Sequence, residues 1–208
     1  SGPQIGVAPA PEFIFRVFVM PVGAYFKGAV KPLKICVSDY DRAAPRGTGN
    51  VKAGLNYAMS LYPTVLAHQA GFAENLYLDP ATRTYVEETG GTNIIFVDAD
   101  NTIVVPKSPS ILPSITRRSL MYVAEHYLGL KVVERQVKLE EVKNFKECAL
   151  CGTAAVLAPV GEIHTHDGVI ALPSGMEKMG EISTKLRQTL TGIQACEIEA
   201  PEGWIYEC

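Results

Sequence analysis

One lysine stands in a long stretch of the sequence that is otherwise without charged side chains. Between Gly47 and Ala73, Lys52 is the only residue with a formal charge when His68 is neutral. A lysine removed from water has a lowered pKa and becomes a nucleophile, which prepares it to form a Schiff base with a carbonyl compound. An ordinary lysine whose charged end reaches the surface is the alternative, and on composition alone it is the more frequent case.

Two neighbouring carboxylates are followed by a glycine pair. Glu87 and Glu88 precede Thr89, Gly90 and Gly91. Adjacent side chains of a strand point to opposite faces, so one carboxylate can face a cavity while the other faces solvent. The glycines allow the backbone to approach a ligand closely. A solvated charge pair at the end of a strand is the alternative.

Two backbone segments have the pattern of anion-binding sites. Ser114 is suited to cap the helix that carries Leu120, which leaves the N–H groups of Ile115 and Thr116 free at the positive end of the helix dipole. A phosphate would fit there, although most capped helices bind no ligand. Thr153, which follows a glycine and precedes a predicted strand, is the second and weaker candidate.

The spacing of Cys148 and Cys151 would suit a zinc ion or a redox pair. A structural zinc site needs four ligands, and the sequence has no second cysteine pair at matching spacing. His164 and His166 lie in a polar, loop-like stretch. We therefore expect no metal and interpret the two cysteines as core thiols. A metal-binding or interaction module built on them is the alternative outside the enzymes.

Composition limits the class of protein. A chain of 208 residues with 47% hydrophobic and 20% charged residues is typical of a globular domain. The net charge of −3 argues against a nucleic-acid-binding surface. No stretch approaches the roughly 20 apolar residues of a membrane-spanning helix. Five cysteines, too few for a disulfide scaffold, suit a reducing compartment, so we expect a cytoplasmic protein.

The apolar pattern predicts a mixture of strands and helices. Short β-prone runs predict strands, the first of them buried, at residues 13–20, 33–38, 76–79, 84–86, 94–98, 102–105, 131–135, 154–160 and 169–172. Helical spacing and glycine stops predict helices at 56–70, from the Ser114 cap to 129, at 139–145 and at 182–192. Most of these strands are linked as hairpins, so the fold class is α+β rather than repeated βαβ units.

Five motifs occur in an order that resembles a known family. They are Gly49–Tyr57, Glu88–Asn93, Leu112–Arg117, Cys151–Ala154 and Leu190–Gln194. This order resembles the branched-chain amino acid aminotransferases, which are pyridoxal-phosphate (PLP) enzymes of fold type IV. The resemblance runs from about Gly6 to Trp204. The last motif, with the segment at 21–26, favours the branched-chain members over the D-amino acid aminotransferases and aminodeoxychorismate lyases of the same fold, which stay as alternatives.

The resemblance implies a fold and a domain organisation. Residues 30–208 would form the PLP-binding large domain of the D-amino acid aminotransferase fold, with mixed β sheets in a pseudo-barrel flanked by helices. Residues 1–29 would be the tail strand of an N-terminal small domain that is missing here. We therefore expect a truncated fragment that catalyses poorly, because the missing region supplies an arginine to the phosphate and, from the partner subunit, groups that bind the substrate.

The resemblance also implies roles for individual residues in binding PLP. Lys52 would form the Schiff base with the cofactor and later carry a proton. Tyr57 would hydrogen-bond the phenolic oxygen, and Glu88 the pyridine nitrogen. The phosphate would be held by the backbone amides of Ile115 and Thr116 and by Thr153.

The substrate groups follow from the same resemblance. Thr153, in a second role, and the amide of Ala154 would meet the substrate carboxylate, and Tyr25 would form an aromatic wall of the side-chain pocket. The expected reaction is transamination of L-leucine, L-isoleucine or L-valine with 2-oxoglutarate, in a homodimer that binds neither nucleic acid nor a membrane.

Overall fold

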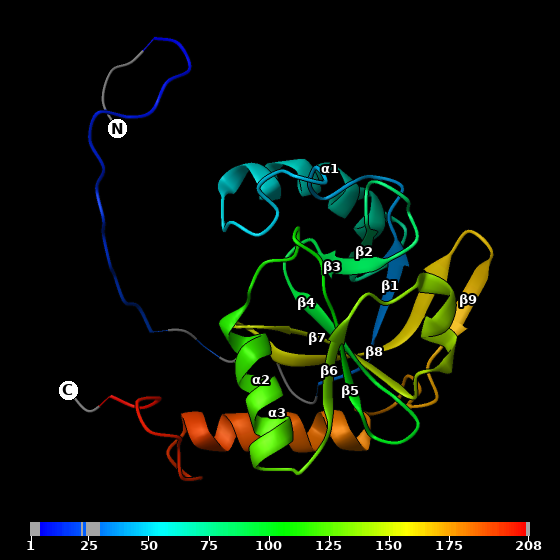
Figure 1. The fold of residues 1–208 in the computed structure, drawn as a ribbon. Helices are drawn as coiled ribbons and strands as arrows, with labels where there is room; N and C mark the ends of the chain where they lie inside the picture. The colour runs from blue at the N-terminus through cyan, green and yellow to red at the C-terminus, as the bar shows by residue number, and fades with distance from the viewer. Residues whose placement is uncertain (1–4, 22, 24–29, 207–208) are drawn as a thin grey trace.

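A computed structural model describes residues 5–21, 23 and 30–206, and its centre is one curled sheet (Figure 1). Within these residues the sheet has nine strands in the order β3-β2-β1-β8-β7-β4-β5-β6, with β9 paired to β8. The strands are β1 Leu33–Val37, β2 Glu74–Leu78, β3 Val86–Thr89, β4 Asn93–Val97, β5 Ile103–Pro106, β6 Val132–Arg135, β7 Glu147–Gly152, β8 Val156–Thr165 and β9 Gly168–Ala171.

Three α-helices and one 3-10 helix surround the sheet. They are α1 Gly54–Gln69, α2 Ile115–His126, α3 Glu181–Gln194 and the 3-10 helix η1 Leu139–Asn144. In Figure 1, α1 lies beside β2 and β3, while α2 and α3 lie together at the opposite side of the molecule. Among the described residues no helix combines the length and the apolar character that a membrane crossing requires.

The strand pairing confirms a mixed sheet in the α+β class. The predicted hairpins β2–β3 and β4–β5 are antiparallel, whereas β1 is parallel to both β2 and β8, and β5 is parallel to β6. The two ends of the strand order approach each other. The N–H of Val86, in β3, donates to the carbonyl of Val137, just after β6, at 2.8 Å, and Tyr85 bridges to Lys138. The sheet therefore closes into the predicted pseudo-barrel.

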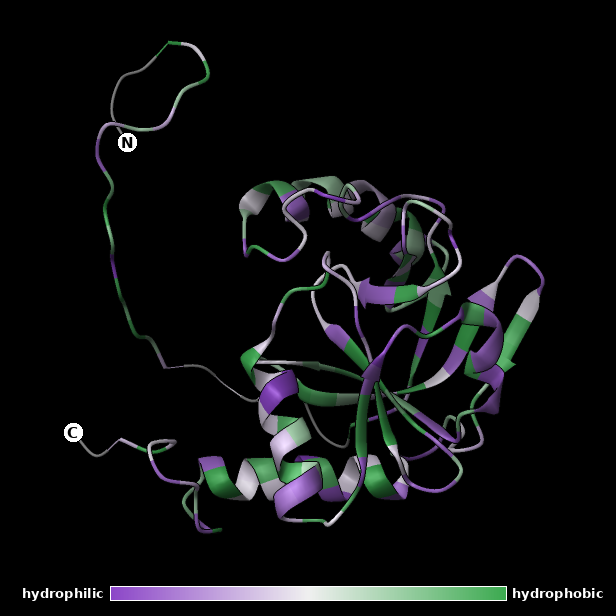
Figure 2. Ribbon diagram, in the orientation of Figure 1, coloured by the Kyte–Doolittle hydropathy of each residue, from purple (hydrophilic) through white to green (hydrophobic). Residues whose placement is uncertain are grey.

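Alternate residues of each strand enter two separate hydrophobic clusters. In β4, Ile94 and Phe96 belong to the cluster inside the curl, and Ile95 belongs to the cluster that α2 and α3 cover. The helices add Leu120 and Leu186 to this outer cluster. Figure 2 shows the hydrophobic residues concentrated on the strands. Each fully buried side chain of this size stabilises the fold by about 1.5–3 kcal/mol, so the packing holds the sheet rigidly.

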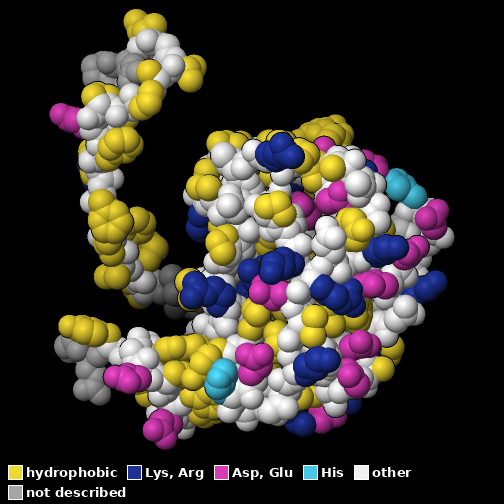
Figure 3. Space-filling view, viewed as in Figure 1, with side chains coloured by type: hydrophobic (Ala, Val, Ile, Leu, Met, Phe, Trp, Pro, Cys, Tyr) yellow, Lys and Arg dark blue, Asp and Glu magenta, His cyan; other side chains and the backbone are white. Residues whose placement is uncertain are grey.

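The prediction of a buried strand at residues 13–20 is wrong. This segment has no strand structure and runs away from the rest of the protein, with Phe13, Phe15 and Phe18 more than four-fifths exposed (Figures 1 and 3). A strand exists only when a neighbour accepts and donates its backbone hydrogen bonds, and no described residue pairs with this one. The assignment of residues 1–29 to another domain stays a prediction.

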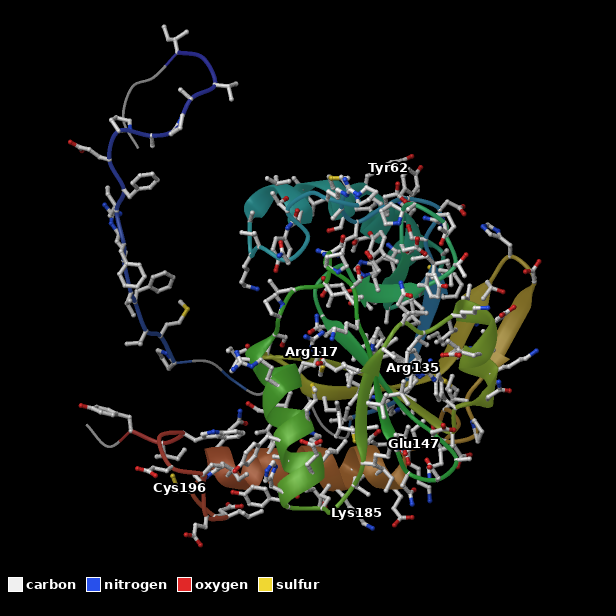
Figure 4. All side chains as sticks on the ribbon, in the orientation of Figure 1. Tyr62, Arg117, Arg135, Glu147, Lys185 and Cys196 are labelled. Carbon is white, nitrogen blue, oxygen red and sulfur yellow. The ribbon has the colours of Figure 1, made fainter. Side chains whose placement is uncertain are left out.

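A buried carboxylate from β7 caps the N-terminus of the last helix. Glu147 accepts hydrogen bonds from the N–H groups of Ile182 at 3.0 Å and Ser183 at 2.8 Å. These are unpaired donors of the first turn of α3, and the N-cap residue itself is Gly180, which has no side chain to bind them. A Cβ on Gly180 would lie 2.2 Å from Cδ of Glu147, so the glycine makes room for the carboxylate. This contact fixes the start of α3 against the sheet (Figure 4).

We expect Glu147→Ala to lower the free energy of unfolding by about 2–3 kcal/mol, because it leaves two buried N–H groups without acceptors. Urea denaturation measures this change. The matched control is Glu181→Ala at the same helix end, where the pair with Lys185 is exposed to water and contributes little to stability. Equal losses in the two variants would contradict the capping role of Glu147.

Candidate active site

Four of the five motifs, which lie far apart in the sequence, meet in one cavity of about 410 Å³, and Leu190–Gln194 does not line it. The loop before α1, the end of β3, the start of α2 and the β7–β8 turn contribute its walls. Six of the predicted site residues line it, namely Lys52, Tyr57, Glu88, Ile115, Thr153 and Ala154. Thr116 is not part of the lining, and Tyr25 lies outside the described residues.

The amine of Lys52 lies beside the phenol of Tyr57. Nζ of Lys52 donates to the Tyr57 hydroxyl at 2.9 Å, and it lies 5.3 Å from the centre of the ring. Lys52 is exposed, which agrees with the interpretation that composition favoured, a lysine whose charged end reaches the surface, and not with a lysine removed from water. The reason is its position, because it lies in the loop just before α1 and its end reaches into an open cavity. The amine and the phenol together form a basic and hydrogen-bonding pair at one wall.

The carboxylate of Glu88 is buried and hydrogen-bonded at both oxygens. Oε1 is 2.7 Å from Nη2 of Arg42 and accepts the N–H of Leu112 at 2.8 Å. Oε2 accepts a hydrogen bond from the side-chain amide of Asn93. Burial raises the pKa of Glu88 to about 7, against the opposing effects of Arg42 and of the hydrogen-bond donors. The carboxylate is therefore held in one orientation and is ready to gain or lose a proton near neutral pH.

The expectation that one of the two neighbouring carboxylates faces solvent is wrong. Glu87 is as buried as Glu88, because every residue of β3 is enclosed. One Glu87 oxygen accepts the hydroxyl of Ser108 at 2.6 Å, and the other has no partner among the described residues. Burial raises the pKa of Glu87, which Ser108 and Arg42 partly oppose. Arg42 thus sits near two buried acids.

The start of α2 has the predicted cap. The side chain of Ser114 accepts the N–H of Arg117 at 3.2 Å, and the helix begins at Ile115. Ile115 is 69% exposed and lies at the cavity, whereas Thr116 is buried behind it. The backbone amides of this first turn point toward the helix start, where an anion would be favoured.

The two cysteines considered as metal ligands lie on opposite faces of β7. Cys148 packs in the inner cluster and Cys151 in the outer cluster, so one ion cannot contact both. Burial raises the pKa of both thiols, which makes them inert. The described residues contain no group of three metal-ligating side chains. The arrangement gives the metal module no support and agrees with core thiols.

The sequence patterns did not single out Arg42, and they included Gly49 and Asn93 only as end residues of two motifs, without a role of their own. Arg42 also donates to the carbonyls of Gly49, at 2.9 Å, and Ser110. A Cβ on Gly49 would lie 2.2 Å from the carbonyl oxygen of Ser110, so the loop needs glycine there. Arg42 lies in the polar loop of residues 39–49, which contains one proline and two glycines, and this pattern does not show that an arginine is buried. Asn93 comes close to Glu88 because the chain turns back between β3 and β4.

Comparison with known proteins agrees with this geometry. The chain is 49% identical over 209 aligned residues to the branched-chain-amino-acid aminotransferase of Haemophilus influenzae, and 44% identical over 208 to that of Helicobacter pylori. These alignments cover 98% and 99% of this chain but 61% and 60% of the two relatives. The chain thus spans about 60% of the length of the curated relatives it matches.

Solved structures share the fold. The branched-chain amino acid aminotransferase of Escherichia coli has a TM-score of 0.74 at 31% identity, covering 86% of this chain and 58% of that one. The same enzyme class from Thermobaculum terrenum in its PLP form has a TM-score of 0.69 at 31% identity, covering 78% and 50%. The family model for amino-transferase class IV matches residues 4–163, which contain Lys52, Glu88 and the start of α2. With the cavity assembled by those residues, this match shows that the chain belongs to the class IV aminotransferases.

Proposed function

We propose that this chain forms the PLP-binding part of a branched-chain-amino-acid aminotransferase. The reaction is exchange of the amino group between L-leucine, L-isoleucine or L-valine and 2-oxoglutarate. The observation that carries the proposal is the meeting of the Lys52 amine, the Tyr57 phenol, the buried Glu88 carboxylate and the start of α2 in one cavity. The high identity to relatives named for this activity supports it further.

The residues of the cavity fit the chemistry of PLP. The cofactor carries an aldehyde for an amine, a phenolic oxygen, a basic ring nitrogen and a phosphate. The cavity presents Lys52 for the aldehyde, Tyr57 for the phenolic oxygen and Glu88 for the ring nitrogen. The amides at Ile115 and Thr116, with Thr153, would hold the phosphate. Oδ1 of Asn93 is buried without a partner among the described residues, which leaves one acceptor beside Glu88 unused.

Each side chain has a definite task in this scheme. When bound, PLP supplies an electron sink for the charge released at the substrate α-carbon. An ionised Glu88 keeps the pyridine nitrogen protonated, and Arg42 and Asn93 hold its two oxygens in place. The free amine of Lys52 is a base that can take the proton from the substrate α-carbon and deliver it to the carbon of the cofactor that carried the aldehyde. Tyr57 orients this amine through their 2.9 Å hydrogen bond.

The substrate side of the cavity is formed by the β7–β8 turn. We assign the amides at Thr153 and Ala154 to the substrate carboxylate, and Tyr25 to the wall that meets the substrate side chain. We further propose that the working enzyme is a homodimer in the cytoplasm. The exposed apolar side chains at residues 13–20 support a further contact surface. The 208 residues alone should catalyse poorly, since the relatives of this activity are longer.

The rival is another fold-type-IV PLP enzyme, such as a D-amino acid aminotransferase. Both would use Lys52 and Glu88 in the same way, so the cavity chemistry does not separate them. Adding L-leucine or D-alanine to the PLP-loaded chain distinguishes the two, because only an accepted amino acid changes the cofactor spectrum. A response to D-alanine with none to L-leucine would favour the rival.

We expect PLP to give a saturable visible absorption band with the purified chain, and reduction with borohydride to leave a pyridoxyl group on Lys52 in mass spectra. Lys52→Ala should abolish both signals, because the cavity then offers no amine. Lys131→Ala, at an exposed lysine outside the cavity, is the matched control and should keep them. An undiminished band in Lys52→Ala would refute the assignment of Lys52.

Without PLP, Glu88 should make stability depend on pH. Its pKa is about 7 in the folded chain, against an ordinary value of 4.5. Between these values the folded state keeps a proton that the unfolded state has released, so the free energy of unfolding falls as pH rises. We expect Glu88→Gln to remove on the order of 2–3 kcal/mol of this decline between pH 4.5 and 7.

Urea denaturation of the PLP-free chain at several pH values measures this effect. The control is Glu140→Gln, whose side chain is 75% exposed and which should leave the pH dependence unchanged. Glu74 and Glu87 also have raised pKa values. They therefore make the free energy of unfolding fall with rising pH in the wild type and in both variants alike. A Glu88→Gln variant with the wild-type decline would show that Glu88 does not titrate in this range.

A further inference from the structure

The turn that joins β7 to β8 ends in a strained residue. Val156 pairs with Gly152 across the hairpin and has a φ of +58°. This left-handed conformation is ordinary for glycine and tolerable for asparagine, but it is a rare outlier for a β-branched side chain. Such strain costs on the order of 1–3 kcal/mol and persists only where the surrounding structure holds it.

The backbone on either side of Val156 is bent tightly. The N–H of Leu157 donates to the carbonyl of Ala155 at 2.7 Å, which closes a three-residue γ-turn with Val156 at its centre. A γ-turn whose central φ is positive is the rare and strained form. The carbonyls of Ala155 and Leu157, on either side of Val156, are therefore the points where a group outside the turn can hold this backbone.

Arg187 of α3 supplies that group. Its Nη1 donates to the carbonyl of Ala155 and, at 2.9 Å, to the carbonyl of Leu157. One guanidinium nitrogen thus joins the backbone before and after the strained residue. The helix that carries Arg187 is itself fixed, since Leu186 is fully buried in the outer cluster and Glu147 holds the first turn.

The other side of the same turn faces the cavity. Thr153 and Ala154 are exposed and line it, while Ala155 behind them is buried. Within the described part of the chain, the amides of Thr153 and Ala154 donate to no protein acceptor. These two N–H groups are therefore free to bind an anion, and their direction depends on how the turn ends at Val156.

We propose that Arg187 is a positioning residue that holds the strained backbone at Val156 and thereby aims the Thr153 and Ala154 amides at the substrate carboxylate. Arg187 does not line the cavity, so it acts from the far side of the turn. The part concerning the carboxylate rests on the proposed function, whereas the holding of the turn stands on the contacts of Arg187 alone.

A second substitution separates this role from a general contribution to packing. Glycine adopts a positive φ freely, so Val156→Gly relieves the strain that Arg187 opposes. If Arg187 acts through Val156, adding Val156→Gly to Arg187→Met restores the turn. If Arg187 only helps α3 to pack, the second substitution restores nothing.

The test compares wild type, Arg187→Met, the double variant and Lys185→Met, an exposed control on the same helix (Figure 4). The first measurement is hydrogen exchange of the Leu157 amide in the purified chain without PLP. The second is the affinity for L-leucine, from the change in cofactor absorbance in the PLP-loaded chain. For Arg187→Met we expect about tenfold faster exchange and about fivefold weaker leucine binding, with PLP affinity unchanged.

The double variant should regain most of both losses, and Lys185→Met should lose neither. Unchanged exchange in Arg187→Met, or no recovery in the double variant, would overturn the holding role. Faster exchange with unchanged leucine affinity, or an equal loss of PLP affinity, would overturn the link to the carboxylate. Absence of the pyridoxyl label on Lys52 in wild type would instead count against the proposed function, and the exchange data would still decide the role of Arg187.

Discussion

The contact on which the site depends is the buried ion pair between Arg42 and Glu88. Both side chains are about 95% enclosed, and an isolated charge in such a place would be strongly unfavourable. The pair is tolerated because its remaining hydrogen bonds are largely filled, by Leu112 and Asn93 on the acid and by two backbone carbonyls on the arginine. One ion pair therefore ties together the loop before α1, the end of β3 and the segment that leads into α2.

This arrangement explains how a polar site can be rigid. Glu88 is held by groups from three separate segments, so its carboxylate cannot turn away when a ligand enters. Lys52 and Tyr57 are less constrained than Glu88, since both are exposed and they are hydrogen-bonded mainly to each other. The cavity thus combines a fixed acid at one wall with a reachable amine at another. The proposed function asks such freedom of the amine, because it would first attack a carbonyl and later carry a proton.

Local patterns in the sequence predicted the local features of the structure. The Ser114 cap and the β2–β3 and β4–β5 hairpins depend on neighbours within a few residues, and each was found as expected. The features that depend on distant partners were missed. Nothing near Arg42 shows that it will be buried against Glu88, 46 positions later. The apolar run at 13–20 predicted a strand, but a strand also needs a partner, which its own residues cannot specify. The resemblance to a family predicted that Lys52, Tyr57 and Ala154 belong to the site. For Lys52, composition alone favoured an ordinary surface lysine.

The parallel pairing of β1 with β8 sets the order in which the chain can fold. Ile35 is paired with Ile163, so the middle of the sheet joins segments 128 residues apart in sequence. Contacts of such long range form slowly, because the intervening loop must first lose its conformational freedom. During synthesis β1 and β7 both keep an unpaired edge until β8 has emerged, and unpaired edges are sites of aggregation. The strand that joins these two edges is also the one that begins at Val156, so the turn proposed to bind the substrate carboxylate is completed only when the sheet closes.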